Sequence, residues 1–561
     1  MKRIPDDMQE TLVIPTAPAD VVFRGGLVYS PGWGSPRPAS VAISRGCITF
    51  VGSDSGVRDR CGPETETIDL HGRLLLPGFH DAHLHPIIGA LDMIECSLQG
   101  LSGVDAYLAH VREYAGRNAD KPFIRGSGWL YGAFPPIGPS KALLDAIVPD
   151  RPVFIKAIDG HSGWVNSKAL AMAGITRVTP DPVGGHIERD PTSGEPTGTL
   201  REWSAMGLVT ALMAKPGPEE QLRGAAFFLK TAAKFGITAF HEAMGKPPFL
   251  KAWSILEERG ELTARMCASL FCDPDRGPEQ MIDLLDVHAR YDRPMMRVHT
   301  GKLFLDGVIE GGTAWVSRPY ANNPSNYGEP IWESANFRRV VSALDRVGLQ
   351  AHIHAVGDAA IRLGLDGLEQ ARSENGTRDS RHQIAHADMV SREDLHRFAK
   401  LGVIANIQPS WFYMDGNFTE GVLQGLGPER AHALYPMRSL LGSGARLACS
   451  SDWPFGGDTI TFNPLNTVRT AVIRRGIGGG IDETYIPEER VTLAQAIDAH
   501  TLGSAFVDFR DRETGTIESG KRADLIVLDR NLFELPAFEI HTAKVLLTLL
   551  DGRSVWRAPE F

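Results

Sequence analysis

The stretch Leu76-Pro77-Gly78-Phe79-His80-Asp81-Ala82-His83-Leu84-His85-Pro86 is the most informative part of this chain. It is typical of a short apolar strand that ends in two histidines two residues apart. Alternate side chains of a strand share one face, so His83 and His85 point the same way while Leu84 points into the packing. Two imidazoles at the end of a strand form half of a site for a divalent metal. A single His-x-His pair is weak evidence, so this interpretation depends on further ligands from later strands.

Seven further apolar runs follow this strand, and helix-like segments separate them. They lie at residues 236–241, 264–270, 301–307, 349–354, 383–386, 403–407 and 445–452. With the first strand they make eight, which is the count of a (β/α)8 TIM-like barrel. In such barrels the chemistry lies at the carboxyl ends of the strands, and several of these runs end in polar residues.

One interval is too long for a plain barrel. About 150 residues separate His85 from the next strand, whereas one strand–helix repeat needs about 30. We therefore assign the barrel to residues 77–96 and 206–507, and we interpret residues 97–205 as an inserted α+β subdomain between strands one and two. Such an insertion is expected to lie over the active-site mouth.

Both ends of the chain are rich in short strands. Residues 20–76 and the C-terminal residues contain β-rich runs bounded by Gly, Pro and Asp turn signals. We expect residues 1–76 and 508–561 to form one composite β-sandwich assembled from both termini. Two unrelated β caps are the alternative.

Metal-binding side chains recur at the strand ends in a fixed order. They are His83, His85, Lys302, His354, His386 and Asp452. The histidines and the aspartate are reasonable Zn²⁺ donors, but a protonated lysine is not. If Lys302 adds carbon dioxide, the resulting carbamate could bridge two cations about 3.5–4 Å apart.

Each of these residues has a structural alternative when it is taken alone. An isolated strand histidine is usually a hydrogen-bonded core residue, Lys302 could pair with Asp306 at the rim, and Asp452 could form a turn. Six such groups on successive strands rarely coincide by chance, so the sequence predicts one or two divalent metals, with Zn²⁺ as the expected ion.

The overall composition is that of an ordinary globular protein. The net charge of -10, with 43% apolar and 22% charged residues, argues against a nucleic-acid surface. The six cysteines have no paired spacing, and no segment has the apolar run of a signal peptide or a membrane span. We expect a cytoplasmic protein with a small-molecule substrate and no membrane partner. The oligomeric state is left open between a monomer and a homodimer.

The chain resembles the amidohydrolase superfamily over nearly its whole length. The motifs are Pro77 to His85, Lys302 within residues 301–307, His354 within residues 354–358, His386, Ser451-Asp452 and residues 518–528. Within the insertion, Gly128-Trp129 and residues 159–170, 184–187 and 196–202 look like the branch that contains N-substituted formamide deformylases, amidohydrolase family 3.

The resemblance implies a barrel with a composite β-sandwich, and it implies that the six residues above are metal ligands with Lys302 carbamylated. There are departures. The sixth strand usually carries Glu before its histidine in this branch, and here it is Ala385. The acidic residue after the second strand is Glu242, preceded by His241, and residues 308–314 are less apolar than usual. These differences concern the substrate pocket more than the metal site.

The expected activity is hydrolysis of a carbon–nitrogen bond other than a peptide bond, in an amide or an N-formyl or N-acyl compound. A metal-activated water would attack, and Asp452 would be the catalytic acid and base. We expect substrate contacts from His161, Trp129 and Trp164 in the insertion and from His352 in the barrel. His352 could instead orient a ligand, and Asn166 could contact substrate or cap a helix.

Two other functions are weighed against this one. Deamination or ring opening of a heterocycle is disfavoured, because deaminases typically need a glutamate after the fifth-strand histidine and residues 355–358 contain none. A non-catalytic metal-binding relative would be expected to have lost a ligand, and all six are present.

Overall fold

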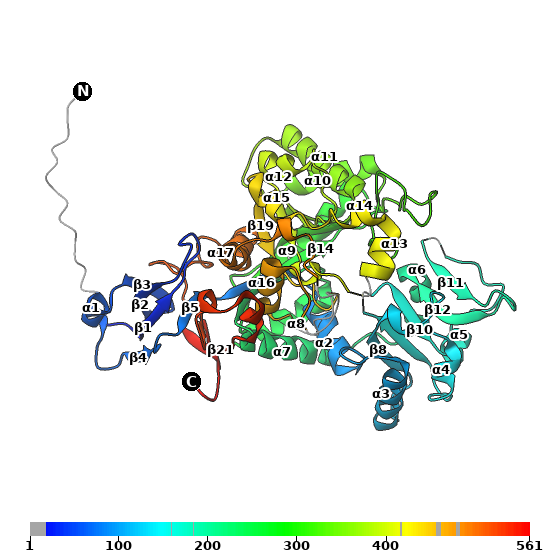
Figure 1. Ribbon diagram of the computed structural model, residues 1–561, viewed down its shortest axis with the longest axis horizontal. Helices are drawn as coiled ribbons and strands as arrows, with labels where there is room; N and C mark the ends of the chain where they lie inside the picture. Colours follow the sequence, from blue (N-terminus) through cyan, green and yellow to red (C-terminus); the bar gives the residue numbers. More distant parts are fainter. Residues whose placement is uncertain (1–17, 159, 183, 416–417, 456–461, 478–482) are drawn as a thin grey trace.

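A parallel barrel sheet forms the centre of the molecule (Figure 1). The computed structural model describes residues 18–158, 160–182, 184–415, 418–455, 462–477 and 483–561. Eight strands lie side by side in chain order, and each is hydrogen-bonded to the next, from β6 and β13 to β19. They are β6 (Phe79–Leu84), β13 (Ile237–Glu242), β14 (Arg265–Phe271), β15 (Met296–Phe304), β16 (Gln350–Ala355), β17 (Gln383–His386), β18 (Ile404–Ile407) and β19 (Arg446–Cys449). The predicted TIM-like barrel is therefore confirmed.

The first and last strands approach each other at their carboxyl ends. The backbone N–H of Asp452 donates to the carbonyl of His83 at 2.8 Å, and that of His85 donates to the carbonyl of Trp453 at 2.8 Å. These bonds nearly close the ring, and they tie the loop after β19 directly to the end of β6.

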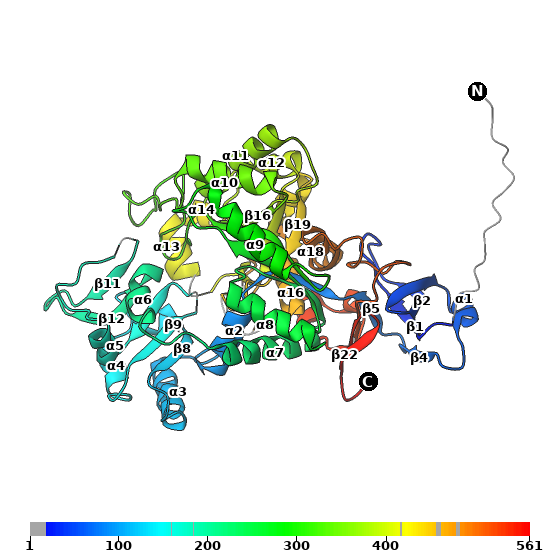
Figure 2. The same cartoon turned by 180° about the vertical axis from the view of Figure 1, so that it is seen from behind.

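Amphipathic helices surround the sheet (Figure 2). In α10 (Ser334–Arg346) the apolar residues Phe337, Val340, Val341 and Leu344 recur at helical spacing and are buried. The other main helices of the barrel are α2 (Pro86–Ile94), α7 (Pro218–Lys234), α8 (Pro247–Glu258), α9 (Met281–Tyr291), α11 (Asp358–Asn375), α12 (Leu395–Leu401), α15 (Met437–Gly442), α16 (Pro464–Ile473), α17 (Leu493–Asp498) and α18 (Ser504–Val507).

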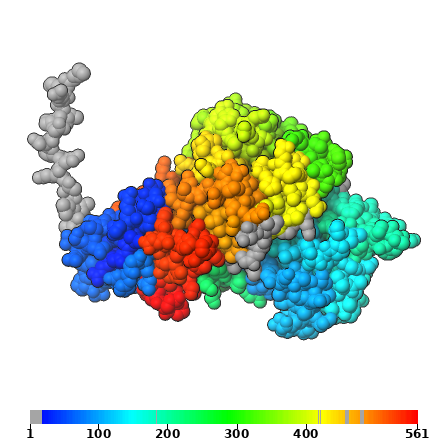
Figure 3. Space-filling model, in the orientation of Figure 1, coloured from blue at the N-terminus to red at the C-terminus, as the bar shows by residue number. Residues whose placement is uncertain are grey.

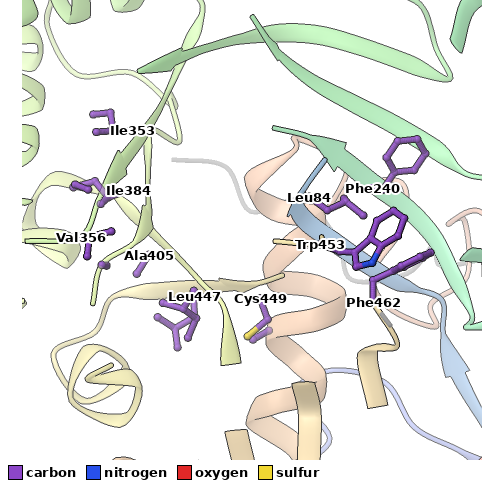
Figure 4. Packing of buried hydrophobic residues seen from close by; sticks show 14 of the residues in the cluster. Leu84, Phe240, Ile353, Val356, Ile384, Ala405, Leu447, Cys449, Trp453 and Phe462 are labelled. Atoms are coloured by element: carbon purple, nitrogen blue, oxygen red, sulfur yellow. The ribbon is translucent and has the colours of Figure 1, made fainter. Parts of the chain in front are cut away.

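An aromatic cluster holds the segment that follows β19. Trp453 packs against Phe462 with ring centroids 4.6 Å apart, and Figure 4 shows both beside Leu84 and Phe240. A Cβ atom at Gly89 of α2 would overlap the indole of Trp453, so this helix approaches closely because the position is glycine. The position of Asp452, the preceding residue, is thereby fixed by packing.

Strands from both ends of the chain join in one eight-stranded sheet. β20 pairs antiparallel with β5, and the blue and red parts of the surface lie side by side in Figure 3. This agrees with the composite arrangement expected from the sequence, although residues 1–17 lie outside the described part. The strands are β1 (Val21–Val28), β2 (Arg37–Ser44), β3 (Cys47–Gly52), β4 (Glu66–Asp69), β5 (Leu74–Pro77), β20 (Leu525–Leu528), β21 (Val545–Leu550) and β22 (Arg553–Arg557).

The segment between β6 and β13 contains a six-stranded sheet of its own, at the right of Figure 1. It has its own buried core, which includes Tyr107, Trp129 and Trp164. Its main elements are β7 (Cys96–Ser97), α3 (Val104–Arg117), β8 (Ile124–Trp129), α4 (Lys141–Asp145), β9 (Val153–Ala157), β10 (Ser162–Val165), α5 (Ser167–Met172), β11 (His186–Arg189), β12 (Pro196–Arg201) and α6 (Glu202–Thr210). Among the described residues, no helix has both the length and the apolar character to cross a membrane.

A buried ion pair joins the barrel to the terminal sheet. Arg265, the first residue of β14, donates to Asp524 at 2.7 and 3.1 Å and also to Asp551. The side chains of Arg265 and Asp524 are 4% and 2% exposed, so solvent screens this pair weakly.

We predict that Arg265→Ala lowers the free energy of unfolding by about 3–5 kcal/mol, because the substitution leaves a buried carboxylate without its partner. Arg290→Ala is the control, since its pair with Asp286 is exposed and should contribute less than about 0.5 kcal/mol. Urea denaturation of the two variants measures the difference, and equal losses would contradict the prediction.

Candidate metal centre

Three of the predicted ligands converge closely at the carboxyl ends of the strands. The ligand atoms of His83, His386 and Asp452 all lie within 4.8 Å of one another, and the three residues are buried. They come from the end of β6, the last residue of β17 and the loop after β19. Residues far apart in the sequence therefore meet because parallel strands of a barrel end at one rim.

The remaining predicted ligands surround these three. Nε2 of His85 lies 3.4 Å from Oδ1 of Asp452, and Nε2 of His83 lies 3.3 Å from the same oxygen. Nζ of Lys302 is 3.4 Å from Nε2 of His83. The ring centroids of His354 and His386 are 4.4 Å apart. Nε2 of His354 donates to the carbonyl of Gly307 at 3.2 Å.

Two of the converging residues have an unusual backbone conformation. His386 and Asp452 have φ angles of 74° and 52°, in the left-handed region that non-glycine residues seldom adopt. Such a conformation costs about 1–3 kcal/mol per residue and persists where the surroundings impose it. Trp411 stacks on His386 with ring centroids 5.3 Å apart, and Asp81 accepts from the backbone N–H of Ser451 at 3.1 Å.

Burial keeps the histidines of the site uncharged. It lowers the pKa of His83 and His386 well below the usual value, and it lowers that of His354 to about 3. Burial also lowers the pKa of Lys302 to about 7. Although burial alone would raise the pKa of Asp452, the neighbouring His85 and His386 lower it below the usual value. The site thus offers imidazole lone pairs and one carboxylate.

Several polar atoms of the site lack hydrogen bonds. Oδ1 of Asp452 and Nδ1 of both His85 and His386 are buried without such a bond within the described residues. A buried carboxylate oxygen in this state is costly unless a cation satisfies it. Nitrogen and carboxylate donors together suit Zn²⁺ and similar divalent ions. The residues present therefore fit a divalent metal.

Aromatic side chains that the sequence reasoning missed lie against the ligands. Phe455 packs on His85 with centroids 5.1 Å apart, and Nζ of Lys302 lies 4.7 Å from the ring centroid of Phe304. Phe455 also touches Gly160 of the insertion, where a Cβ would lie 2.8 Å from its ring. The insertion and the metal cluster are thus in contact through this residue.

His161 and Glu202 form a pair in the insertion. Nδ1 of His161 lies 2.9 Å from Oε2 of Glu202, which has a φ of 65°. A Cβ at Gly311, in the loop after β15, would lie 3.2 Å from Oε1 of Glu202. His161 contributes to lowering the pKa of His354, so the pair lies near the barrel mouth. Asp159, in the same predicted motif, lies outside the described residues.

The substrate contacts predicted for Trp129 and Trp164 are wrong. Both side chains are fully buried in the core of the insertion, and their indole N–H groups donate to the carbonyls of Ile155 and Ser140 at 2.9 Å each. A side chain without accessible surface cannot touch a substrate. Asn166 caps α5, because its side chain accepts from the backbone N–H of Ala169.

The substrate contact predicted for His352 is also wrong. His352 has no exposed surface, and its Nε2 lies 2.8 Å from Nδ1 of His83. It is two residues before His354 on β16 and therefore lies one layer deeper in the barrel. This placement agrees with the other expectation for it, which was to orient a ligand.

Comparison with known proteins gives a consistent result. Residues 66–556 match the amidohydrolase family. The protein LONG AFTER FAR-RED 3 of Arabidopsis thaliana is 31% identical over 96% of this chain and 92% of its own length. An N-substituted formamide deformylase of Arthrobacter pascens is 28% identical over 91% of this chain and 94% of its own. The crystal structure of an uncharacterized metal-dependent hydrolase from Pyrococcus furiosus is 25% identical, with a TM-score of 0.71 over 91% of this chain and 99% of that one.

We predict that His386→Ala lowers the metal content of the purified protein to less than about a tenth of the wild-type value, because it removes one of three converging donors. His110→Ala, on α3 of the insertion, is the control and should retain the full content. Elemental analysis after gel filtration measures both. Full metal content in His386→Ala would exclude this residue from the metal site.

Proposed function

This chain belongs to the amidohydrolase family and is a metal-dependent hydrolase, and we propose that it cleaves the carbon–nitrogen bond of an amide, in particular of an N-formyl or N-acyl amine. The observation that carries the proposal is the position of Asp452. Its Oδ1 is buried, makes no hydrogen bond to a described residue and lies 3.3 Å from Nε2 of His83 and 3.4 Å from Nε2 of His85.

The proposed metal ligands are His83, His85, Lys302, His354, His386 and Asp452. A bound divalent ion, for which we propose Zn²⁺, would polarise the substrate carbonyl and lower the pKa of water. Lys302 has its amine beside His83 in a fully buried position. We propose that this amine is carbamylated, since an anionic oxygen ligand there would balance the charge of one or two cations.

Asp452 has the position of a proton carrier. Its carboxylate would orient the attacking water and accept the proton at Oδ1 as the carbonyl carbon is attacked. The same group would then deliver this proton to the nitrogen, because an amine leaves readily only when it is protonated. The backbone bond from Asp452 to His83 keeps the carboxylate in place during both transfers.

His161 is the proposed substrate contact in the insertion. Glu202 holds its ring near the barrel mouth, and Trp203 packs edge-on against it while 58% exposed. The similarity to an N-substituted formamide deformylase supports a formyl or acyl substrate. Deamination of a heterocycle is the second candidate, on the same metal scaffold, and the absence of glutamate from residues 355–358 argues against it.

We predict that Asp452→Asn lowers kcat by about 10³-fold, because an amide cannot accept and return the proton. The reaction is followed as release of formate or carboxylate from a panel of N-formyl and N-acyl amines, with ammonia release measured alongside. Elemental analysis separates loss of proton transfer from loss of metal. A variant with more than a tenth of the wild-type kcat would refute the role of Asp452, and ammonia as the product would favour deamination.

We predict that dialysis against a chelator abolishes hydrolysis and that Zn²⁺ restores it, since water at neutral pH is too weak a nucleophile for an amide without activation. Magnesium is the control ion, because it prefers oxygen ligands and should restore little activity. Undiminished activity in metal-free protein would contradict the proposal.

A further inference from the structure

A continuous series of hydrogen bonds runs inward from the proposed metal centre through the barrel. We define this series as the relay, and its members in order are His83, His352, Ser269, His241 and Asp508. The successive distances are 2.8 Å from His83 Nδ1 to His352 Nε2, 2.9 Å from His352 Nδ1 to Ser269 Oγ, 2.7 Å from Ser269 Oγ to His241 Nε2, and 2.6 Å from His241 Nδ1 to Asp508 Oδ1.

The relay connects opposite ends of the barrel. His83 lies at the carboxyl end of β6, whereas Asp508 follows α18 at the amino ends of the strands. Gln350, the first residue of β16, donates to the carbonyl of Val507 at 2.8 Å, so the segment that contains Asp508 lies at the amino end of this strand. All five members are 1% exposed or less, so bulk water does not compete for their hydrogen bonds.

Asp508 fixes the direction of every bond in the relay when His241 carries a single proton. Its carboxylate can only accept hydrogen bonds. One oxygen accepts from Nδ1 of His241 and the other from Nε2 of His80, each at 2.6 Å. When His241 carries one proton, this proton therefore lies on Nδ1, and Nε2 accepts the hydroxyl proton of Ser269.

The same reasoning continues to the metal centre. Because the proton of Ser269 is donated to His241, its oxygen must accept from Nδ1 of His352. An uncharged His352 then has only Nε2 as an acceptor, and this atom receives the N–H on Nδ1 of His83. The lone pair of His83 is left on Nε2, the atom that faces Asp452 and Lys302.

We propose that Asp508 is a positioning residue which, through the relay, holds His83 in the tautomer that can bind a cation. Metal-ligating histidines commonly donate their second nitrogen to a carboxylate, which fixes the tautomer. Here three intermediate side chains separate the carboxylate from the ligand. The inference rests on the proposed function, because it takes His83 as a metal ligand.

The test uses the metal-loaded full-length enzyme and measures the dissociation constant of Zn²⁺ by chelator competition. Ser269→Ala should weaken Zn²⁺ binding by about 10- to 100-fold, because it interrupts the relay without changing any charge. Cys267→Ala is the matched control. Cys267 is equally buried on β14 and its thiol lies 3.9 Å from the carbonyl oxygen of Asp508, but it is not a member of the relay.

A second variant tests whether the residues act as one series. Asp508→Ala should weaken Zn²⁺ binding to a similar extent. The double variant with Ser269→Ala should bind Zn²⁺ no more weakly than the single variant with the lower affinity, since the same connection is already broken. If Asp508→Ala does not fold, the comparison of Ser269→Ala with Cys267→Ala decides alone.

Three results would overturn the relay. They are wild-type affinity in Ser269→Ala, an equal loss in Cys267→Ala, or losses that multiply in the double variant. The proposed function fails separately. If the wild-type protein binds no Zn²⁺ in the same titration, the metal centre is wrong. If wild-type protein binds Zn²⁺, His83→Ala loses it and Ser269→Ala does not, only the relay is wrong.

Discussion

The near-closure of the parallel barrel is the constraint on which the candidate site depends. Parallel strands that form a ring must all end at the same rim, so the last side chain of each strand faces those of the others. The hydrogen bonds between the end of β6 and the segment after β19 join the first and the last contributor. Without them Asp452 would have no fixed relation to His83, and packing of Trp453 against Phe462 and α2 adds a second restraint.

The interior of this barrel is unusually polar for a buried space. Histidines, Asp81, Ser269 and Asp508 occupy positions that branched apolar residues fill in many barrels. Burying such groups is unfavourable unless each donor finds an acceptor. Most of them do so through neighbours on adjacent strands, but several buried polar atoms among the described residues do not, and these include Oδ1 of Asp452 and Nδ1 of His85 and His386. These three atoms belong to residues that would hold a cation.

Much of the fold could be predicted from the sequence, because each barrel strand is a short apolar run followed by a helical pattern. The convergence of His83, His386 and Asp452 could also be predicted from the sequence, since the carboxyl ends of parallel barrel strands lie at one rim. The depth of His352 was missed, because spacing gives its face but not its layer. Trp129 and Trp164 were misassigned because the insertion needs a core of its own. The pairing of His161 with Glu202 and the contribution of Asp508 depend on contacts between distant segments, which a single sequence does not reveal.

The order of strands in the terminal sheet bears on how the chain can fold during synthesis. β5 lies between β1 and β20, so one edge of β5 has no partner until residues 525–528 have been made. An unpaired apolar strand edge is prone to join other chains. Nearly the whole polypeptide must therefore be synthesised before the second edge of Leu74–Pro77 can pair with β20. A chaperone that shields this edge during synthesis would raise the yield of native protein.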